Sequence, residues 1–344
     1  MRAGRNIIAV LDGTAAGEGT NPQVLSCGSE IAGRTGGRLF GVLLGSQDAL
    51  ASDDAIAADA AALGLSEAFV LREPWLAEYQ AEAYLHALSL VCRQLNPGLI
   101  LFSHNSISQE VAPRLAARLR AALVTDCVGL DTDADGKTLV ATGLSFSGKA
   151  LAEWALDREA PAIVTLRRQA GSNGAGGSNH SCTVVTCAVD EPPALRSRLR
   201  GRVSPPAGEL RLEDADVVVA VGRGVGSAEA FQAHVVDGLA RTLGAACGGS
   251  RGAVDSGIIR PELQIGLTGR VVSPKLYIAV GLSGSPQHMA GCSGAQTLVA
   301  VNTDSQAPIF GFAHYGVVGD YREVIPAMTA QFQEMAEAAR APRA

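Results

Sequence analysis

Three glycine-rich loops in the C-terminal half of this 344-residue chain carry the side chains best suited to chemistry. The first loop, GRGVGS at 222–227, lies between a predicted strand at 216–221 and a predicted helix at 228–243. Glycines allow close approach of the backbone to an anion, and a helix N-terminus offers unpaired N–H groups. Arg223 adds a fixed positive charge suited to phosphate. The pattern favours an anion site, although a tight turn without a ligand also explains it.

The second loop, at 281–291, follows a predicted buried strand at 276–280. Two such loops at strand ends of one sheet favour a dinucleotide crevice more than either loop does alone. Ser283, Gln287 and His288 could hydrogen-bond a cofactor ring, but a lone histidine in this position is more often a core or turn residue. A hydrolase is disfavoured, because the serine and histidine lack a placed carboxylate and no G-x-S-x-G motif occurs.

The third site candidate combines Ser250-Arg251 with IGLTGR at 265–270. Both segments place hydroxyl or guanidinium donors beside glycines, and surface arginines with turn glycines explain them equally well. Taken together, the three loops contain many hydrogen-bond donors and few carboxylates. This balance favours an anionic, phosphate-bearing ligand.

The elements that must position these loops alternate between strands and helices, which predicts an α/β fold with mostly parallel, doubly wound sheets. We expect two domains, at 1–190 and 213–344, joined by a Pro- and Arg-rich linker at 191–212. A Gly/Ser/Asn segment at 170–180 has the composition of a flexible stretch. The predicted strands lie at 7–11, 39–44, 68–71, 99–103, 140–144, 162–166, 182–189, 216–221, 276–280, 297–301 and 309–313. The predicted helices lie at 23–35, 56–63, 77–94, 111–120 (with Pro113 in its first turn), 228–243 and 321–339.

Composition excludes several classes of protein. The net charge of −6 argues against a dedicated nucleic-acid binder, and 47% apolar residues argue against global disorder. No apolar run reaches the roughly 18 residues that span a bilayer, so we expect no membrane insertion. The seven cysteines and six histidines are scattered, which fits reduced thiols and predicts no metal site. With no targeting signal, a cytoplasmic bacterial protein is the expectation.

The C-terminal half resembles the electron transfer flavoprotein α subunit family. The segments that carry the resemblance, in matching order, are GRGVGS (222–227), GGSRGAVDSG (248–257), IGLTGR (265–270), LYIAVGLSGSPQH through AVN (276–302) and APIFGFAHYGVVGDY (307–321). A looser match in the first half rests on PRLAARL (113–119) and on Thr125-Asp126.

The resemblance implies an electron carrier, with no catalytic residue of its own, that forms a heterodimer with a β subunit. It implies an N-terminal adenine-nucleotide α-hydrolase-like domain that docks the β subunit and holds no nucleotide, and a C-terminal Rossmann-like domain that binds FAD. Dehydrogenases would donate electrons and a quinone oxidoreductase would accept them. Whether the β subunit carries AMP or a second FAD stays open.

The resemblance also implies a set of FAD-binding residues. Arg223 is expected beside the cofactor, Ser250 and Ser283 near its phosphates, and Asn302 and Asp320 at the adenosine half. Arg251, Thr268 and His288 are expected around the isoalloxazine, where Arg251 and His288 would stabilise negative charge on the reduced ring. The remaining implied residues are Gly266, Leu267, Gly281, Gly284, Gln287 and Tyr321.

Two positions depart from the family pattern. Leu267 stands where the family has glutamine, and Pro286 stands where it has isoleucine or valine. Both bear on redox tuning more than on FAD binding. Two other functions stay open: a nicotinamide-dependent dehydrogenase that uses the same crevice, and an adenine-nucleotide-sensing protein without redox function.

Overall fold

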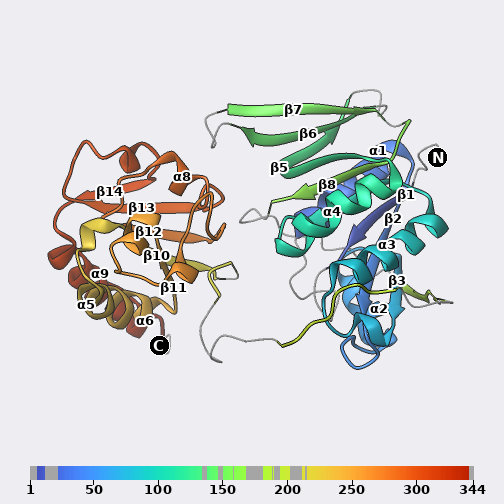
Figure 1. The fold of residues 1–344 in the computed structure, drawn as a ribbon. Coiled ribbons are helices and arrows are strands. Elements are labelled where there is room, and N and C mark those ends of the chain that lie inside the picture. Colours follow the sequence, from blue (N-terminus) through green and yellow to red (C-terminus); the bar gives the residue numbers. More distant parts are fainter. Residues whose placement is uncertain are drawn as a thin grey trace. The chain divides into compact units, whose positions relative to one another are not determined.

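The computed structural model divides the chain into two compact units, one formed by residues up to about 200 and one by residues after it (Figure 1). The structure describes residues 6–11, 22–133, 138–145, 150–157, 159–167, 181–187, 189, 194–201, 211–213 and 215–340. The predicted segment at 170–180 lies outside the described residues, and so does much of the predicted linker at 191–212. The predicted domain boundaries therefore stay predictions.

The first unit is built on a sheet whose described strands run in the order β7-β6-β5-β8-β4-β1-β2-β3-β9. The run β5-β8-β4-β1-β2-β3-β9 pairs in parallel throughout, whereas β5 and β6 pair antiparallel. The strands are β1 (Asn6–Val10), β2 (Arg38–Gly45), β3 (Glu67–Arg72), β4 (Pro97–Ser103), β5 (Ala122–Thr132), β6 (Thr138–Ser145), β7 (Ala150–Asp157), β8 (Ala162–Leu166) and β9 (Thr183–Thr186). The helices are α1 (Pro22–Thr35), α2 (Asp53–Ala62), the 3-10 turn η1 (Pro74–Leu76), α3 (Ala81–Leu95) and α4 (Ser106–Leu119).

The central strands of this sheet are buried on both faces, as a doubly wound fold requires. Successive side chains of a strand point to opposite faces. In β1, Ile7 and Ala9 join one apolar cluster, while Ile8 and Val10 join the other. This explains why the strand is apolar at every position and lacks the alternation of a half-exposed strand.

The second unit has a smaller sheet, in the order β11-β10-β12-β13-β14, in which all described pairings are parallel. Its strands are β10 (Val217–Val221), β11 (Ala246–Gly249), β12 (Leu276–Val280), β13 (Thr297–Asn302) and β14 (Tyr315–Val318). One helical run follows β10 and comprises α5 (Ala228–Ala230), the π-helical η3 (Phe231–Ala240) and α6 (Arg241–Leu243). The other helical elements are η2 (Arg223–Val225), α7 (Arg251–Asp255), η4 (Pro261–Leu263), α8 (Pro286–Met289), η5 (Pro308–Gly311) and α9 (Tyr321–Arg340).

The strand order decides where a ligand can enter the second unit. The chain passes from β10 to β11 on one side and then returns to place β12 on the other side of β10. The connections after β10 and β12 therefore leave the sheet toward opposite faces and open a crevice at the carboxyl ends of these strands. The predicted α/β class with two parallel-sheet domains is confirmed.

Two local predictions are wrong. The expected strand at 309–313 is the 3-10 turn η5, which Pro308 begins, and the strand of this region is β14 instead. All four residues of β14 are exposed because it lies at a sheet edge, so it lacks the apolar pattern of a buried strand. Pro113 lies well inside α4 and not in its first turn, because Asn105 caps that helix six residues before the predicted start at residue 111.

Candidate functional site

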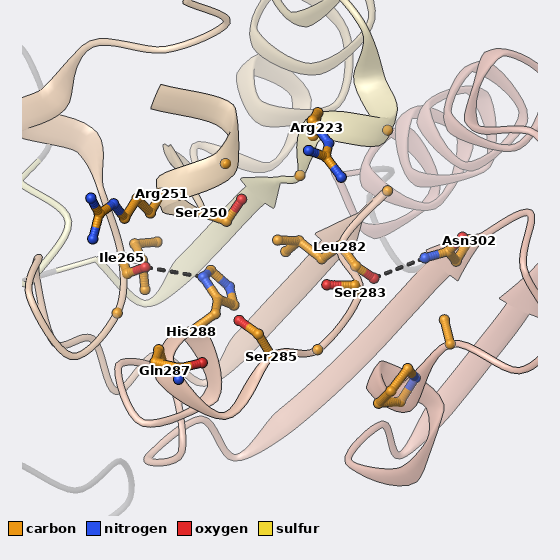
Figure 2. Close-up of a pocket in the computed structure, with 18 of the residues that line it drawn as sticks. Arg223, Ser250, Arg251, Ile265, Leu282, Ser283, Ser285, Gln287, His288 and Asn302 are labelled. Atoms are coloured by element: carbon orange, nitrogen blue, oxygen red, sulfur yellow. Dashed lines mark hydrogen bonds between the residues drawn. The ribbon is translucent and has the colours of Figure 1, made fainter. Parts of the chain in front are cut away.

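A pocket of about 630 Å³ occupies the crevice of the second sheet, within the volume range of ligand sites (Figure 2). We call it the C-terminal pocket. It is lined by Gly222, Arg223, Gly224, Ser250, Arg251, Gly252, Gln264, Ile265, Gly266, Leu267, Thr268, Gly281, Leu282, Ser283, Gly284, Ser285, Gln287, His288, Asn302, Asp304, Ala307 and Pro308. Twelve of the fourteen predicted site residues are in this lining, which brings together all three loops identified from the sequence.

The first two glycine loops touch through their backbones. The N–H of Gly222 donates to the carbonyl of Val280 at 2.8 Å, and the N–H of Gly224 donates to that of Gly281 at 3.3 Å. A Cβ at position 222 would lie 2.0 Å from the Gly281 carbonyl oxygen, a distance that no side chain tolerates. Position 222 therefore requires glycine, because any side chain there would overlap the backbone of Gly281 and Leu282.

A second close contact ties the η5 turn to the pocket. Gly284 has φ +83°, in the left-handed region, and a Cβ there would lie 2.4 Å from the backbone nitrogen of Ile309. The N–H of Ile309 donates to the carbonyl of Ser283 at 3.0 Å. This bond brings Ala307 and Pro308 to the pocket, so the segment mistaken for a strand forms part of its wall.

Two arginines supply positive charge to the lining. Figure 2 shows Arg223 and Arg251 on separate segments, and they are the first residues of η2 and α7. Among the described residues, Arg223 has no ion-pair partner, whereas Nε of Arg251 lies 3.5 Å from a carboxylate oxygen of Asp255. Asp304 is the acidic residue of the lining. An unpaired guanidinium beside a glycine loop is suited to a phosphate group.

Hydroxyl groups also belong to the lining. Ser250 directly follows β11 and caps the N-terminus of α7, where its Oγ accepts a hydrogen bond from the N–H of Ala253. Within the described part of the chain, the hydroxyls of Ser283 and Ser285 have no protein partner, so both can donate to a ligand. Asn302, at the end of β13, donates from Nδ2 to the Leu282 carbonyl at 2.8 Å (dashed in Figure 2). Its amide thus holds the Ser283 loop in place.

His288 lies in the lining but differs in state from the sequence expectation. It is 4% exposed, and burial lowers its pKa to about 4. Its Nδ1 lies 3.0 Å from the Ile265 carbonyl and its Nε2 lies 2.8 Å from the Tyr277 hydroxyl. Burial thus favours the uncharged imidazole at neutral pH, which argues against the expectation that His288 supplies positive charge to a reduced ring.

Leu267 and Thr268 form one end of the lining. The N–H of Leu267 donates to the Gln287 carbonyl at 2.7 Å, and its side chain is 53% exposed. The hydroxyl of Thr268 accepts a hydrogen bond from Nε2 of Gln264. Pro286 is the first residue of α8, where a missing N–H costs no helix hydrogen bond. Both departures from the family pattern fit the local structure without distortion.

Asp320 and Tyr321 are the two predicted residues that the lining does not include. Hydrogen bonds from the Arg322 side chain and backbone lower the pKa of Asp320 to about 2. The Tyr321 hydroxyl donates to the Val225 carbonyl at 2.8 Å, so this residue supports the first glycine loop from outside the pocket.

Several lining residues escaped the sequence analysis, among them Gln264, Ser285 and Asp304. Asp304 and Ser285 follow the ends of neighbouring parallel strands, β13 and β12, and this adjacency was the available signal. Gln264 had none, because it enters the lining through the bridge that its strand-like segment forms with Gly249.

Comparison with known proteins gives the family. Residues 211–293 match the electron transfer flavoprotein FAD-binding domain, and residues 20–192 match the electron transfer flavoprotein domain. The electron transfer flavoprotein subunit alpha of Bacillus subtilis is 35% identical over 317 residues, covering 91% of this chain and 92% of its own. The chain belongs to the electron transfer flavoprotein α subunit family.

Two further relatives agree with this family. The α subunit of Thermoanaerobacterium thermosaccharolyticum is 35% identical over 275 residues, 80% of this chain and 82% of its own. Protein FixB of Azorhizobium caulinodans is 36% identical over 313 residues, 90% of this chain and 84% of its own. As an α subunit of this family, the chain carries an FAD-binding domain, and the C-terminal pocket lies mostly within it.

The residues present fit FAD. The volume of the pocket, the unpaired Arg223 and the unpartnered hydroxyls of Ser283 and Ser285 suit a large ligand with a diphosphate. Among the described residues, no cluster of His, Cys, Asp and Glu side chains could hold a metal ion. The described helices include none that is long and apolar enough to cross a membrane.

Proposed function

We propose that the C-terminal pocket holds FAD and that the chain passes electrons from dehydrogenases to a quinone oxidoreductase as one half of a heterodimer. The observation that carries the proposal is the convergence of Arg223, Ser250 and Ser283 at the strand-order reversal between β10 and β12. When bound, FAD supplies the one- and two-electron chemistry, which no amino-acid side chain of the pocket provides.

The residues divide by the part of FAD that they face. Arg223, Ser250 and Ser283 bind the diphosphate, because guanidinium, hydroxyl and turn N–H groups all donate hydrogen bonds to anionic oxygens. Asn302 lies toward the adenosine half and orients the Ser283 loop through its bond to Leu282. Asp320 and Tyr321, which flank this end, act from outside the lining.

The other end of the pocket binds the isoalloxazine ring. Arg251 and Thr268 face it with polar groups, and Leu267 covers its edge with an apolar side chain. Arg251 is exposed, and its ion pair with Asp255 is long, at 3.5 Å. Its guanidinium can therefore turn toward negative charge on the ring. We assign the stabilisation of negative charge on the reduced ring to Arg251 rather than to the neutral His288.

The proposal includes a β subunit as the partner of the first unit, and a cytoplasmic bacterial location for the complex. α subunits of this family pair with a β subunit. The test is co-expression of this chain with the β subunit of the same bacterium, followed by size and stability measurements. A chain that is monomeric, loaded with FAD and equally stable without the β subunit contradicts the heterodimer.

The electron-transfer function is tested on the purified complex. The expected result is a flavin absorption spectrum that a reduced dehydrogenase bleaches and a quinone oxidoreductase restores. Arg223→Ala should lower the FAD content, whereas Arg241→Ala, which removes an exposed arginine paired with Asp237 outside the pocket, should not. Oxidation of a small substrate with NAD would replace the proposal with the dehydrogenase, and adenine nucleotide bound without flavin would replace it with the nucleotide sensor.

A further inference from the structure

A hydrogen-bond chain runs from the core of the second sheet to the wall of the C-terminal pocket. It begins at Tyr277 on β12, which is fully buried, passes through His288 on α8 and ends at the carbonyl of Ile265. The two bonds are 2.8 Å and 3.0 Å long, and the second is dashed in Figure 2. The chain joins two pocket loops that are more than twenty residues apart in the sequence.

The partners of His288 determine where its proton lies. A carbonyl oxygen can only accept a hydrogen bond, so Nδ1 of His288 must carry the hydrogen that it donates to Ile265. In the neutral ring Nε2 then has a lone pair, which accepts the hydrogen of the Tyr277 hydroxyl. In this arrangement every donor and acceptor of the chain has a partner, and the Cys292 thiol is a further hydrogen-bonding neighbour of the Tyr277 hydroxyl.

No neighbouring charge opposes this state. The titratable groups that face the imidazole are Tyr277 and Cys292, and burial raises the pKa of both, that of Cys292 to about 12. Burial is the main cause of the low His288 pKa, and no charged side chain contributes to it. Both neighbours are therefore neutral across the physiological range, as His288 is.

We infer that Tyr277 is a positioning residue of the FAD site, which holds His288 as a neutral Nδ1–H imidazole that fastens the loop at 264–268 to the loop at 285–289. Thr268 and Leu267 lie on the first loop and Gln287 on the second, so the bond to Ile265 sets their separation at the ring end of the pocket. A parallel bond from the Leu267 N–H to the Gln287 carbonyl supports the same contact. The positive charge of the described lining then comes from Arg223 and Arg251 alone.

The first test reads the histidine itself and does not depend on FAD. The complex with the β subunit is labelled with ¹⁵N-histidine, and the His288 signals are those lost in His288→Asn. The ring nitrogens should show the neutral Nδ1–H form with no titration between pH 8 and pH 5. Tyr277→Phe removes the donor to Nε2 and should raise the titration midpoint by about one pH unit. An Nε2–H ring, a midpoint between pH 6 and 7 in the wild type, or no change in Tyr277→Phe would each overturn the inference.

The second test measures the release of FAD and rests on the proposed function. In His288→Asn, Nδ2 occupies nearly the place of Nδ1 and keeps the donor to Ile265, whereas His288→Leu cannot donate. FAD should therefore leave His288→Leu several-fold faster than His288→Asn, with Tyr277→Phe between wild type and His288→Leu. Tyr79→Phe, which removes a tyrosine hydrogen bond to Glu110 in the first unit, is the matched control and should leave the rate unchanged.

Equal FAD release from His288→Leu and His288→Asn would overturn the role of the bond in the pocket. A wild-type complex that binds no FAD but shows the Nδ1–H ring would contradict the proposed function and leave the state of His288 standing. The two failures are thus separable.

Discussion

Each sheet of this chain has a reversal of strand order beside its first strand, between β1 and β4 in the first sheet and between β10 and β12 in the second, and each has a cavity at the carboxyl ends of the strands there. In the second sheet it is the C-terminal pocket of about 630 Å³. In the first sheet it is a cavity of about 270 Å³ beside the ends of β1, β2 and β4, which we call the N-terminal cavity. The same topology thus creates both hollows.

The walls of the two cavities differ in chemistry. The described lining of the N-terminal cavity is mainly aliphatic and aromatic, includes Glu78, and contains no lysine or arginine. A capping box occupies the N-terminus of α4 there: the Asn105 side chain accepts from the Ser108 N–H, and the Ser108 hydroxyl accepts from the Asn105 N–H. These two N–H groups are therefore already hydrogen-bonded within the protein. The doubly wound fold therefore provides a crevice in both units, but only the side chains of the second unit suit a phosphate.

The largest effect should come from glycines at the two cavities. Gly222→Ala forces a methyl group onto the Gly281 carbonyl and should destabilise the second unit by about 3 kcal/mol and abolish FAD binding. At Gly45, in the N-terminal cavity, a Cβ would meet only the side chain of Leu50, which can move, so Gly45→Ala should cost about 1 kcal/mol.

Thermal melting with FAD content measures both variants. Gly311→Ala, where a Cβ meets open space, is the control in the second unit. Equal losses of stability in Gly222→Ala and Gly45→Ala would contradict the prediction that a clash with backbone atoms costs more than a clash with a movable side chain.

Acidification should weaken the second unit through His288. The pKa of His288 is about 4 in the folded protein, whereas an imidazole in the unfolded chain has a pKa of 6.5. Between these two pH values the unfolded chain therefore binds one more proton than the folded chain. Stability from this residue is complete above about pH 6.5 and falls as the pH drops toward 4, by on the order of 3 kcal/mol. Melting temperature against pH measures it. A His288→Asn variant with the same acid slope as the wild type would show that other groups cause the loss.

The two cavities should differ in the ligands that they bind: FAD in the C-terminal pocket should depend on Arg223, and AMP should not bind in the N-terminal cavity. Arg223→Ala deletes a charge-assisted hydrogen bond worth about 1.5–3 kcal/mol and should weaken FAD binding roughly 10- to 150-fold. AMP added to the complete heterodimer should make no contact with the N-terminal cavity, measured by chemical shifts of methyl groups at Leu44 and Val111. Chemical-shift changes confined to those methyl groups would show that AMP binds in the N-terminal cavity and would contradict the prediction.

Arg251→Ala should change the cofactor potential more than its affinity. The guanidinium is exposed, so we take the lower limit for a bond to a charged group, about 1.5 kcal/mol, which corresponds to about 60 mV for one electron. The first one-electron potential should fall by that amount, because negative charge on the ring loses a partner. Potentiometric titration measures it, and an unchanged potential in a holoprotein that retains FAD would place Arg251 away from the ring.

The smallest effect is expected at the cap of α4. Asn105→Ala removes the acceptor for the Ser108 N–H and should lower stability by about 1 kcal/mol. FAD content and potential should not change, because this cap belongs to the first unit. Chemical denaturation with flavin absorbance measures both. Loss of FAD in this variant would show that the stability of the first unit affects FAD binding in the second, contrary to the prediction.

The pocket-forming loops could be predicted because their signals are local. A buried strand, a glycine-rich turn and a helix follow one another at 216–243, and this order places Arg223 at a strand end whatever the rest of the chain does. The buried strands β1, β4, β8 and β12 were predictable for the same reason, since burial on both faces demands an apolar residue at every position.

The errors occur where distant residues decide. Asp126 has φ +59° at an irregularity in β5, and β7 is almost wholly exposed, so neither strand shows the pattern that marks a buried one. The Ile309 segment is apolar like a strand, but its N–H bonds to Ser283 and bends it into a turn.

The state of His288 shows the division most clearly. The sequence by itself determined that a histidine stands in a glycine loop after β12, in a chain with the motifs of a flavin-binding subunit. Only the tertiary structure decided that this histidine is neutral and turned toward Ile265 and Tyr277. The protonation of a side chain depends on its burial and on the donors and acceptors around it, and here those come from residues 11 and 23 positions away that the parallel sheet brings together.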